Sequence, residues 1–431
     1  MTHTDVWRLT LIVGAIVVVL VGCCWRRVQL GRRRDSPRPC RHWRPRTPDD
    51  CPHCRQGCDR PPASPQPLAV RPWRDGRSRR GAPRRIPTEG YACRTPGCLY
   101  VGITDSHIHA LVADGYHGRT DHIQDFVCQA CGKRVSARWG TALFQLKTPP
   151  ARIGAVLSAL AEGLSVCAAV RVFGHGEATI TRWRDGGAQH AARLHHHFLH
   201  DLHLPHVQLD EIRTRLRPRT RVLWLWLALD PKTKLIPALA LGARTQQTAH
   251  TLVHGLRATL AAGCTPVITT DGLRLYFYAL TAHFGRWVTA GRRQVWQVDP
   301  ALLYGQLHKR YQRRRLVRIR YQMGCGSRHA LQEALRALDW SGRLQTAFVE
   351  RLNLTVRQSV AALTRRTWAT AQTADGLQHQ VEWWRAYYHF VRPHRSLRRH
   401  SRACTPAMAA GLATHRWTVA EVLSYPCARA A

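Results

Sequence analysis

The chain has 431 residues, 45% of them hydrophobic, which is enough for two or three domains with buried cores. Lys and Arg number 65 against 26 Asp and Glu, and the formal net charge of +39 is spread along the whole sequence. Such an excess favours a polyanionic partner, because each phosphate that a basic side chain neutralises releases condensed counterions. We therefore expect nucleic-acid binding, although a coding bias toward Arg or a basic tail would raise the charge in the same way.

Fifteen cysteines are present, but a chain of this length and hydrophobic content does not need a disulfide scaffold. Several of them lie in short CxxC-type spacings, which are typical of metal binding in a reducing compartment. The pair Cys51 and Cys54, with Cys58 nearby, is a weak example because it stands alone.

The N-terminal segment, residues 1–25, contains an apolar run at residues 9–25 that is at the lower limit for a membrane-spanning helix. Basic residues out to Arg34 would keep the rest of the chain inside the cell. We therefore expect a cytoplasmic or nucleoid protein with a candidate tether to the inner face of the membrane. A signal peptide and a wrongly assigned start codon are the alternatives. Residues 26–90, rich in Arg and Pro, are expected to form a flexible basic linker.

Two cysteine pairs define a candidate zinc ribbon over residues 91–147. The first pair encloses four residues and the second encloses two; together they are Cys93, Cys98, Cys128 and Cys131. Two such turns suit one tetrahedral Zn²⁺, and Gly97 and Gly132 suit the tight backbone that directs the sulfurs inward. Four buried thiols without metal are the alternative. The histidines that could replace a thiolate are His107, His109, His117 and His122.

Residues 151–190 have the pattern of a helix-turn-helix DNA-binding domain. Three helices are predicted, at residues 152–162, 166–173 and 177–185. Ser165 is placed to cap the second helix. In the third helix the apolar side chains face the core, while Thr181 and Arg182 face outward, as in a helix that recognises DNA. A plain helical bundle is the alternative.

From residue 205 the pattern changes to strands. Three are predicted, at residues 206–210, 222–229 and 235–241. Short connections make them an antiparallel meander, and Pro237 places the third at an edge. A helix at residues 248–261 leads to a strand at residues 266–271, and this crossover implies parallel pairing with an earlier strand. The expected fold is α/β: an RNase H-like mixed sheet flanked by helices over residues 205–400, followed by a tail at residues 401–431.

This order places Asp210 and Asp271 on neighbouring strands, close enough to share a metal. A third carboxylate is expected from a helix at residues 346–367, one face of which carries Glu350, Asn353 and Arg357. Cleavage of a phosphodiester by two metals requires hard oxygen ligands, so carboxylates suit the task. The alternatives are Glu211 in place of Asp210, a simple turn at Asp271, and Glu333 or Glu382 in place of Glu350.

These residues resemble insertion-sequence DDE transposases. The resemblance is carried by Leu209-Asp210-Glu211, by Thr270-Asp271-Gly272 with Tyr276, and by residues 349–354, 223–226, 363–367 and 405–408; it spans roughly residues 91–420. It implies that Asp210, Asp271 and Glu350 bind Mg²⁺ or Mn²⁺ and that Arg357 contacts DNA. It also implies cleavage at the terminal inverted repeats of a transposon, strand transfer into target DNA, and a homo-oligomeric complex.

Residues 306–321 carry a dense cationic run, in which Lys309 and Arg310 are expected to contact the DNA backbone; a solvated basic strand is the alternative. Two other functions fit parts of the sequence. One is a non-catalytic zinc-ribbon and helix-turn-helix DNA-binding protein derived from a decayed transposase. The other is an RNase H-like nuclease that acts on RNA or hybrids.

Overall fold

The structure is a computed structural model of the chain. It describes residue 88 and residues 91–427, apart from short gaps at residues 106–107, 109, 119–120, 218–220, 314, 339–340 and 399–401. The chain divides into two units, residues 1–72 and 73–431, and all described residues lie in the second. The predicted membrane segment at residues 9–25, the pair Cys51 and Cys54, and nearly all of the predicted linker lie outside the described residues. Within the described ranges, no helix combines the length and the hydropathy needed to cross a membrane.

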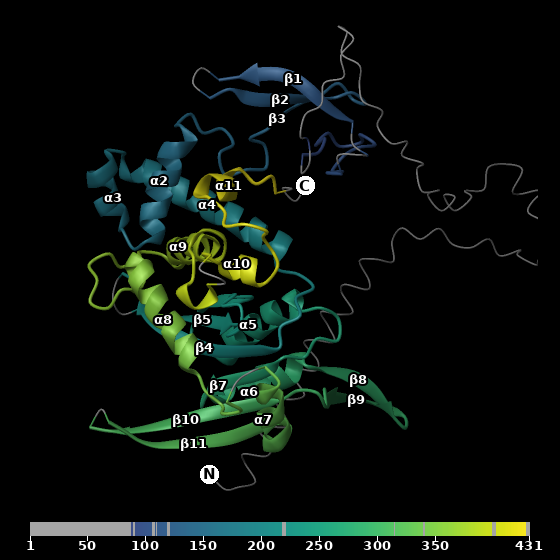
Figure 1. The fold of residues 1–431 in the computed structure, drawn as a ribbon, viewed down its shortest axis with the longest axis vertical. Helices are drawn as coiled ribbons and strands as arrows, with labels where there is room; N and C mark the ends of the chain where they lie inside the picture. Colours follow the sequence, from purple (N-terminus) through teal and green to yellow (C-terminus); the bar gives the residue numbers. More distant parts are fainter. Residues whose placement is uncertain are drawn as a thin grey trace, which may run out of the picture. The chain divides into compact units, whose positions relative to one another are not determined.

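The first described element is a small antiparallel sheet of three strands (Figure 1): β1 (Leu111–His117), β2 (Ile123–Cys128) and β3 (Arg134–Ser136). Its core is small and contains Cys93, Cys98 and Cys128 beside Leu111 and Phe126. So few buried side chains supply little hydrophobic stabilisation.

Three helices follow: α2 (Pro150–Ala161), α3 (Val166–Phe173) and α4 (Glu177–Phe198). The predicted cap is confirmed, because the hydroxyl of Ser165 accepts a hydrogen bond from the backbone N–H of Ala168 at 3.2 Å. The predicted end of α4 near residue 185 was wrong. Gly187 does not break the helix; a Cβ there would lie 3.3 Å from Trp383, so glycine allows the two helices to pack closely.

The main sheet has six strands in the order β11-β10-β7-β4-β5-β6. Their bounds are β4 (His206–Arg215), β5 (Val222–Leu229), β6 (Leu239–Gly242), β7 (Val267–Asp271), β10 (Tyr304–Gln312) and β11 (Arg315–Cys325). As predicted, β4, β5 and β6 are antiparallel, and β7 pairs parallel to β4 after the crossover helix α5 (Gln246–Thr259). The mixed sheet flanked by helices is consistent with an RNase H-like fold.

Strand β6 is shorter than predicted: it begins at Leu239, and the segment at residues 235–238, which contains Pro237, lies outside it. There the backbone N–H of Ile236 donates to Nε2 of His389 at 3.0 Å, and its carbonyl accepts from the guanidinium of Arg385. The missing strand hydrogen bonds are thus replaced by two buried side chains.

Helices cover both faces of this sheet. One core joins β4 and β5 to α5 and to α6 (Arg274–His283), and the other joins them to α8 (Ala347–Ser359) and α9 (Ala374–Ala386). Helix α8 ends eight residues before the predicted boundary at residue 367. Val360 and Leu363 are nevertheless buried in the predicted stripe, because a 3₁₀ turn (Ala361–Leu363) carries them into the same core.

The buried side chain of Gln208 joins β4 to the start of α8. Its amide N–H donates to the carbonyl of Gln345 at 2.7 Å, and its Oε1 accepts from the backbone N–H of Val349 at 3.0 Å.

The remaining strands and α-helices are β8 (Gly285–Ala290), β9 (Arg293–Val298), α7 (Arg328–Arg336), α10 (Pro406–Ala409) and α11 (Val419–Ser424).

Candidate active site

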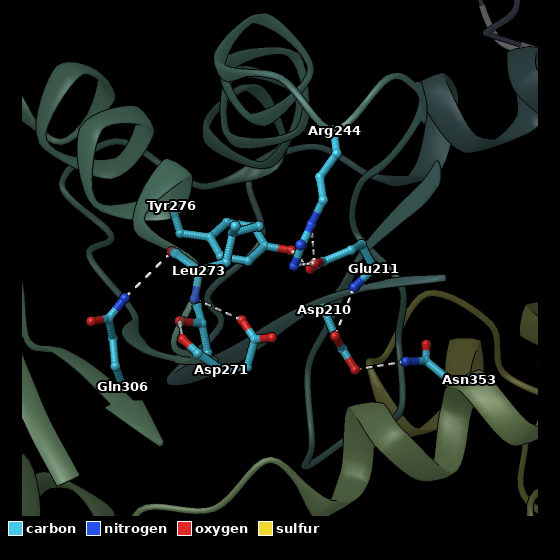
Figure 2. A network of polar contacts seen from close by, with 9 residues as sticks. Asp210, Glu211, Arg244, Asp271, Leu273, Tyr276, Gln306 and Asn353 are labelled. Carbon is cyan, nitrogen blue, oxygen red and sulfur yellow. Dashed lines mark hydrogen bonds and ion pairs between the residues drawn. The ribbon is translucent and has the colours of Figure 1, made fainter. Parts of the chain in front are cut away.

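Three carboxylates lie together where β4 and β7 run side by side (Figure 2). Asp210 and Glu211 are in β4 and Asp271 ends β7, and each offers an oxygen within 4.8 Å of the others. Because β4 and β7 are parallel, with Leu209 opposite Thr270, the residues that follow these two reach the same place in the sheet. The strand register therefore explains the cluster.

Hydrogen bonds orient the two aspartates. Oδ1 of Asp210 accepts from the backbone N–H of Glu211 at 2.8 Å, and Oδ2 accepts from the side-chain amide of Asn353 on α8 at 2.7 Å. Oδ1 of Asp271 accepts from the backbone N–H of Leu273 at 3.0 Å. None of these donors is charged, so they position the carboxylates without neutralising them.

Glu211 differs from the aspartates, because its carboxylate is paired with a cation. Oε2 accepts from the hydroxyl of Tyr276 at 3.0 Å, and Oε1 accepts from two nitrogens of Arg244, at 3.0 and 2.5 Å. The Arg244 guanidinium also stacks 4.8 Å from the centre of the Trp224 ring. Arg244 thus compensates the charge of Glu211, and the aspartates remain the less compensated charges.

The electrostatics of the cluster favour a bound cation. Burial, together with the negative charges of Asp271, Glu211 and Glu350, raises the pKa of Asp210 to about 7, although the hydrogen bond from the backbone N–H of Glu211 opposes this. Burial and the charge of Asp271 also raise the pKa of Glu211, although Arg244 opposes this. In addition, the buried Oδ1 of Asn353 has no hydrogen-bond partner among the described residues. Crowded hard oxygen donors with uncompensated charge fit a divalent metal.

Glu350, the predicted third carboxylate, is not in this group. It lies on α8, where Oε1 accepts from the Lys309 ammonium and, at 2.5 Å, from the hydroxyl of Thr346. Its charge still contributes to the raised pKa of Asp210, so the two carboxylates lie near each other. Glu211, which the sequence suggested as a competitor of Asp210, instead lies beside it.

The other acids considered for this position are engaged elsewhere. Glu333 is in an exposed pair with His329, 3.2 Å away. Glu382 is buried with His195 and Arg385, and the charge of Arg385, with the contact to His195, holds its pKa at about 2 even though burial alone would raise it.

The predicted DNA contacts lie in three places. Thr181 is half-buried and Arg182 exposed on α4. Lys309 and Arg310 are on β10, which pairs with β11 at the edge of the main sheet. At the end of α8, the guanidinium of Arg357 donates to the carbonyl of Leu363 at 3.4 Å and to that of Arg213 at 3.5 Å.

Two residues near the cluster were missed at the sequence level. Arg244 follows β6, and no local pattern connects it to Glu211. His308 could have been found, because Leu307 is opposite Asp271 in the parallel register, which places His308 beside Gly272. A Cβ on Gly272 would meet the His308 imidazole, whose buried Nε2 has no hydrogen-bond partner among the described residues.

Four free thiols meet beside the small sheet. Sγ of Cys93 lies 3.5 Å from that of Cys131, Sγ of Cys98 lies 3.8 Å from that of Cys128, and all four are within 4.8 Å of one another. A tetrahedron of zinc–sulfur bonds near 2.3 Å requires sulfurs about 3.8 Å apart, so the spacing fits a zinc site. Gly97 (φ 80°) and Gly132 (φ 69°) supply the predicted turns.

The charges of the thiols also fit a metal. Burial raises the pKa of Cys128 to about 12, whereas the backbone N–H of Lys133 lowers that of Cys131 to about 6. A buried group of this kind ionises fully only beside a cation. Among the predicted histidine substitutes, His117 is paired with Asp125 at 2.8 Å and is not in the group.

Comparison with known proteins places one part of the chain in a family context. Residues 342–401 match a family model described as an integrase core domain, and this segment contains Glu350 and Arg357. No curated protein matches the chain. The match supports an integrase- or transposase-type domain and implies DNA as a partner. Integrase-type domains use divalent metals, which agrees with the carboxylate cluster.

Proposed function

We propose that the chain is a DNA transposase of the DDE type, related to those of insertion sequences, that cleaves transposon ends and joins them to target DNA. The observation that carries this proposal is the cluster of Asp210, Glu211 and Asp271 on parallel strands of a mixed sheet. The integrase core match on the helix that carries Glu350 supports it. Asp210, Asp271 and Glu350 are the proposed catalytic and Mg²⁺- or Mn²⁺-binding residues.

The residues of the chain have separate tasks in this reaction. A divalent metal at the carboxylates supplies a nucleophile at neutral pH and relieves charge on the phosphate. Asp210 and Asp271 would hold it, each already oriented by a neutral donor, Asn353 or Leu273. Arg357 would contact a phosphate of the bound strand.

DNA binding offers a route by which Glu350 would join the aspartates. Lys309, the cation that now holds Glu350, is itself a proposed contact of the DNA backbone. A phosphate that takes Lys309 removes the charged partner of Glu350. The carboxylate is then free to turn toward Asp210, whose pKa already responds to it.

The N-terminal parts of the described chain would recognise DNA. In this proposal the four cysteines bind one structural zinc in a zinc ribbon over residues 91–147, and residues 151–190 form a helix-turn-helix in which Thr181 and Arg182 contact the transposon end. The remaining divisions follow those predicted above, with a catalytic domain over residues 205–400. A homo-oligomer acting on paired ends, at a cytoplasmic or nucleoid site, belongs to the same proposal, as does membrane tethering through residues 9–25.

The test is cleavage of a duplex carrying the inverted repeat that flanks the reading frame, in Mg²⁺ or Mn²⁺. Asp271→Asn keeps the size of the side chain but removes the charge, so we expect nicking to be lost while end binding persists. Asp201→Asn is the matched control, because Asp201 is exposed and paired only with His200. Unchanged cleavage by Asp271→Asn would show that the carboxylate assignment is wrong.

One observation favours a second candidate, a non-catalytic DNA-binding protein derived from a transposase. Glu350 is held by Lys309 and Thr346 and is not among the clustered carboxylates. This candidate predicts end-specific binding that is independent of divalent metal, and no strand scission by the unaltered protein.

A further inference from the structure

An arginine-rich pocket lies at the C-terminal end of α8, outside the carboxylate cluster. It has a volume of about 490 Å³ and is formed by the end of β4, by α8 and by the segment that follows it. Its lining includes Arg213, Arg215, Arg357, Arg365, Arg366 and Trp368. No acidic side chain is among the described residues that line it.

Among the described residues, no ion pair compensates the charge of this pocket. In the described part of the chain, the ion pairs that involve arginine are formed by other arginines. Burial lowers the pKa of Arg357, and the neighbouring positive charge of Arg365 lowers it further, although the negative charge of Asp210 opposes this. Five guanidinium groups gathered in one pocket therefore favour a ligand with several negative charges.

The loop that carries these arginines is fixed to α8 rather than loose. The hydroxyl of Thr364 donates to the carbonyl of Arg357 at 2.9 Å, and the Arg357 guanidinium donates back to the carbonyl of Leu363. Arg366 has a φ of 56°, which a residue other than glycine adopts at a cost in energy. These contacts hold the loop in position, with Arg365 and Arg366 lining the pocket.

Trp368 adds a feature that a simple anion pocket does not need. Its side chain is 88% exposed, more than any other large hydrophobic side chain in the described part of the chain. It lines both the arginine pocket and a neighbouring pocket of about 500 Å³ that reaches Thr181 on α4. An indole left in water beside phosphate-binding groups is suited to stack on a base.

We infer that the pocket binds an unpaired DNA strand, with the arginines on its phosphates and Trp368 stacked on a base. In a duplex the faces of the bases are covered by their neighbours, so the indole can stack only where the strand is open. The pocket is close to the proposed reaction centre: Arg213 follows Asp210 by three residues on β4, about 10 Å of strand. An unpaired strand that reaches the carboxylates would therefore also reach this pocket.

This inference rests on the proposed function for the identity of the ligand, but its test needs no cleavage. Binding of the full chain to oligonucleotides is measured in EDTA, with single-stranded, fully paired and partly opened duplex probes. A 2-aminopurine base in the probe reports stacking through its fluorescence. Loss of cleavage in Asp271→Asn and loss of stacking in a Trp368 variant are then separate results.

We expect Trp368→Ala to weaken binding of single-stranded and opened probes by about tenfold or more, since stacking on an aromatic side chain contributes about 1–3 kcal/mol per base. Binding of the paired duplex should change by less than about twofold, and Trp368→Phe should keep most of the affinity. Trp287→Ala is the control, because Trp287 is 65% exposed on the separate β8–β9 hairpin.

The arginines are tested by the dependence of binding on salt. Replacing Arg365 and Arg366 by Ala should reduce the slope of log K against log salt by about 1.4 for the single strand, which is 0.7 for each lost phosphate contact. If Trp368→Ala binds the open probes as the unaltered protein does, the inference is overturned. Equal displacement of all probes by polyglutamate would also overturn it, because the pocket would then accept any polyanion.

Discussion

The side-chain amide of Asn353 donates a hydrogen bond to Oδ2 of Asp210 at 2.7 Å, although the two residues are 143 positions apart in the sequence. The bond joins α8 to β4 next to the carboxylate cluster. Nδ2 of Asn353 is the donor in this bond, and the buried Oδ1 of Asn353 has no hydrogen-bond partner among the described residues. A small polar residue on α8 thereby sets the orientation of an acid that the sheet provides.

Asn353→Ala should therefore raise the metal concentration needed for half-maximal cleavage by about 10–100-fold, the usual effect of losing a partner of a metal-binding side chain. Titration with Mn²⁺, followed by cleavage and by calorimetry, measures the change. Thr355→Ala is the control, since Thr355 is half-buried on the same helix and its hydroxyl donates to the carbonyl of Arg351. A metal requirement that stays the same in Asn353→Ala would contradict a positioning role.

The identity of the third carboxylate can be decided by two charge-removing substitutions. If Glu350 turns toward Asp210 when DNA binds, Glu350→Gln should lower the cleavage rate by more than about 100-fold. This is more than the usual loss of activity when a residue that only positions a metal ligand is replaced. Glu211→Gln should have the smaller effect, because Arg244 and Tyr276 already hold that carboxylate. The reverse order would assign the third position to Glu211, and thermal melting of both variants checks that they are folded.

Metal analysis tests the site of the four cysteines. We expect about one zinc per chain, lost on substitution of Cys128 by Ser together with the fold of the small sheet, because so small a core depends on its metal. The zinc content is measured by mass spectrometry and the fold by limited proteolysis. Cys167→Ser is the control, since Cys167 is exposed and outside the group. Full zinc content in Cys128→Ser would count against the site.

Acid should destabilise the protein through buried histidines. Burial lowers the pKa of His206 to about 4 from 6.5, and Nε2 lies 2.9 Å from the hydroxyl of Thr269. Below pH 6.5 the unfolded chain binds a proton that folded His206 does not, so stability decreases as the pH falls from 6.5 toward 4. The difference of about 2.5 pKa units corresponds to about 3 kcal/mol.

Urea unfolding at pH 7 and pH 4.5 measures this effect. In His206→Gln the decrease between the two pH values should be smaller than in the unaltered protein by about 2–3 kcal/mol. His200→Gln should show the full decrease, because the His200 side chain is 64% exposed. The prediction concerns the change with pH, so a constant loss of stability in His206→Gln does not affect it. An equal decrease in both variants would refute it.

The sheet could be predicted where local pattern and connection length determine it. The bounds of β5 and α3 agree with the prediction, because an unbroken apolar run and a capped helix each have clear ends. The parallel pairing of β7 with β4 followed from the helix between them. This pairing places Asp210 beside Asp271.

The errors arose where distant residues decide the outcome. Helix α4 continues past Gly187, and Trp383, almost two hundred positions later, packs against that glycine, a contact that no local pattern indicates. The carboxylate of Glu350 is held by Lys309, which lies on another strand, so its side-chain direction could not be read from the face of α8. Arg244 reaches Glu211 across the sheet, and no spacing in the sequence indicates such a contact.

The two hydrogen bonds of Gln208 limit how the site can rearrange. They connect the start of α8 to β4, the strand that carries Asp210. One of them binds the backbone N–H of Val349, the residue before Glu350. A piston-like shift of the whole helix would break both bonds inside the core. Glu350 would therefore reach the aspartates by rotation of its own side chain, a local and fast motion, while α8 stays in place.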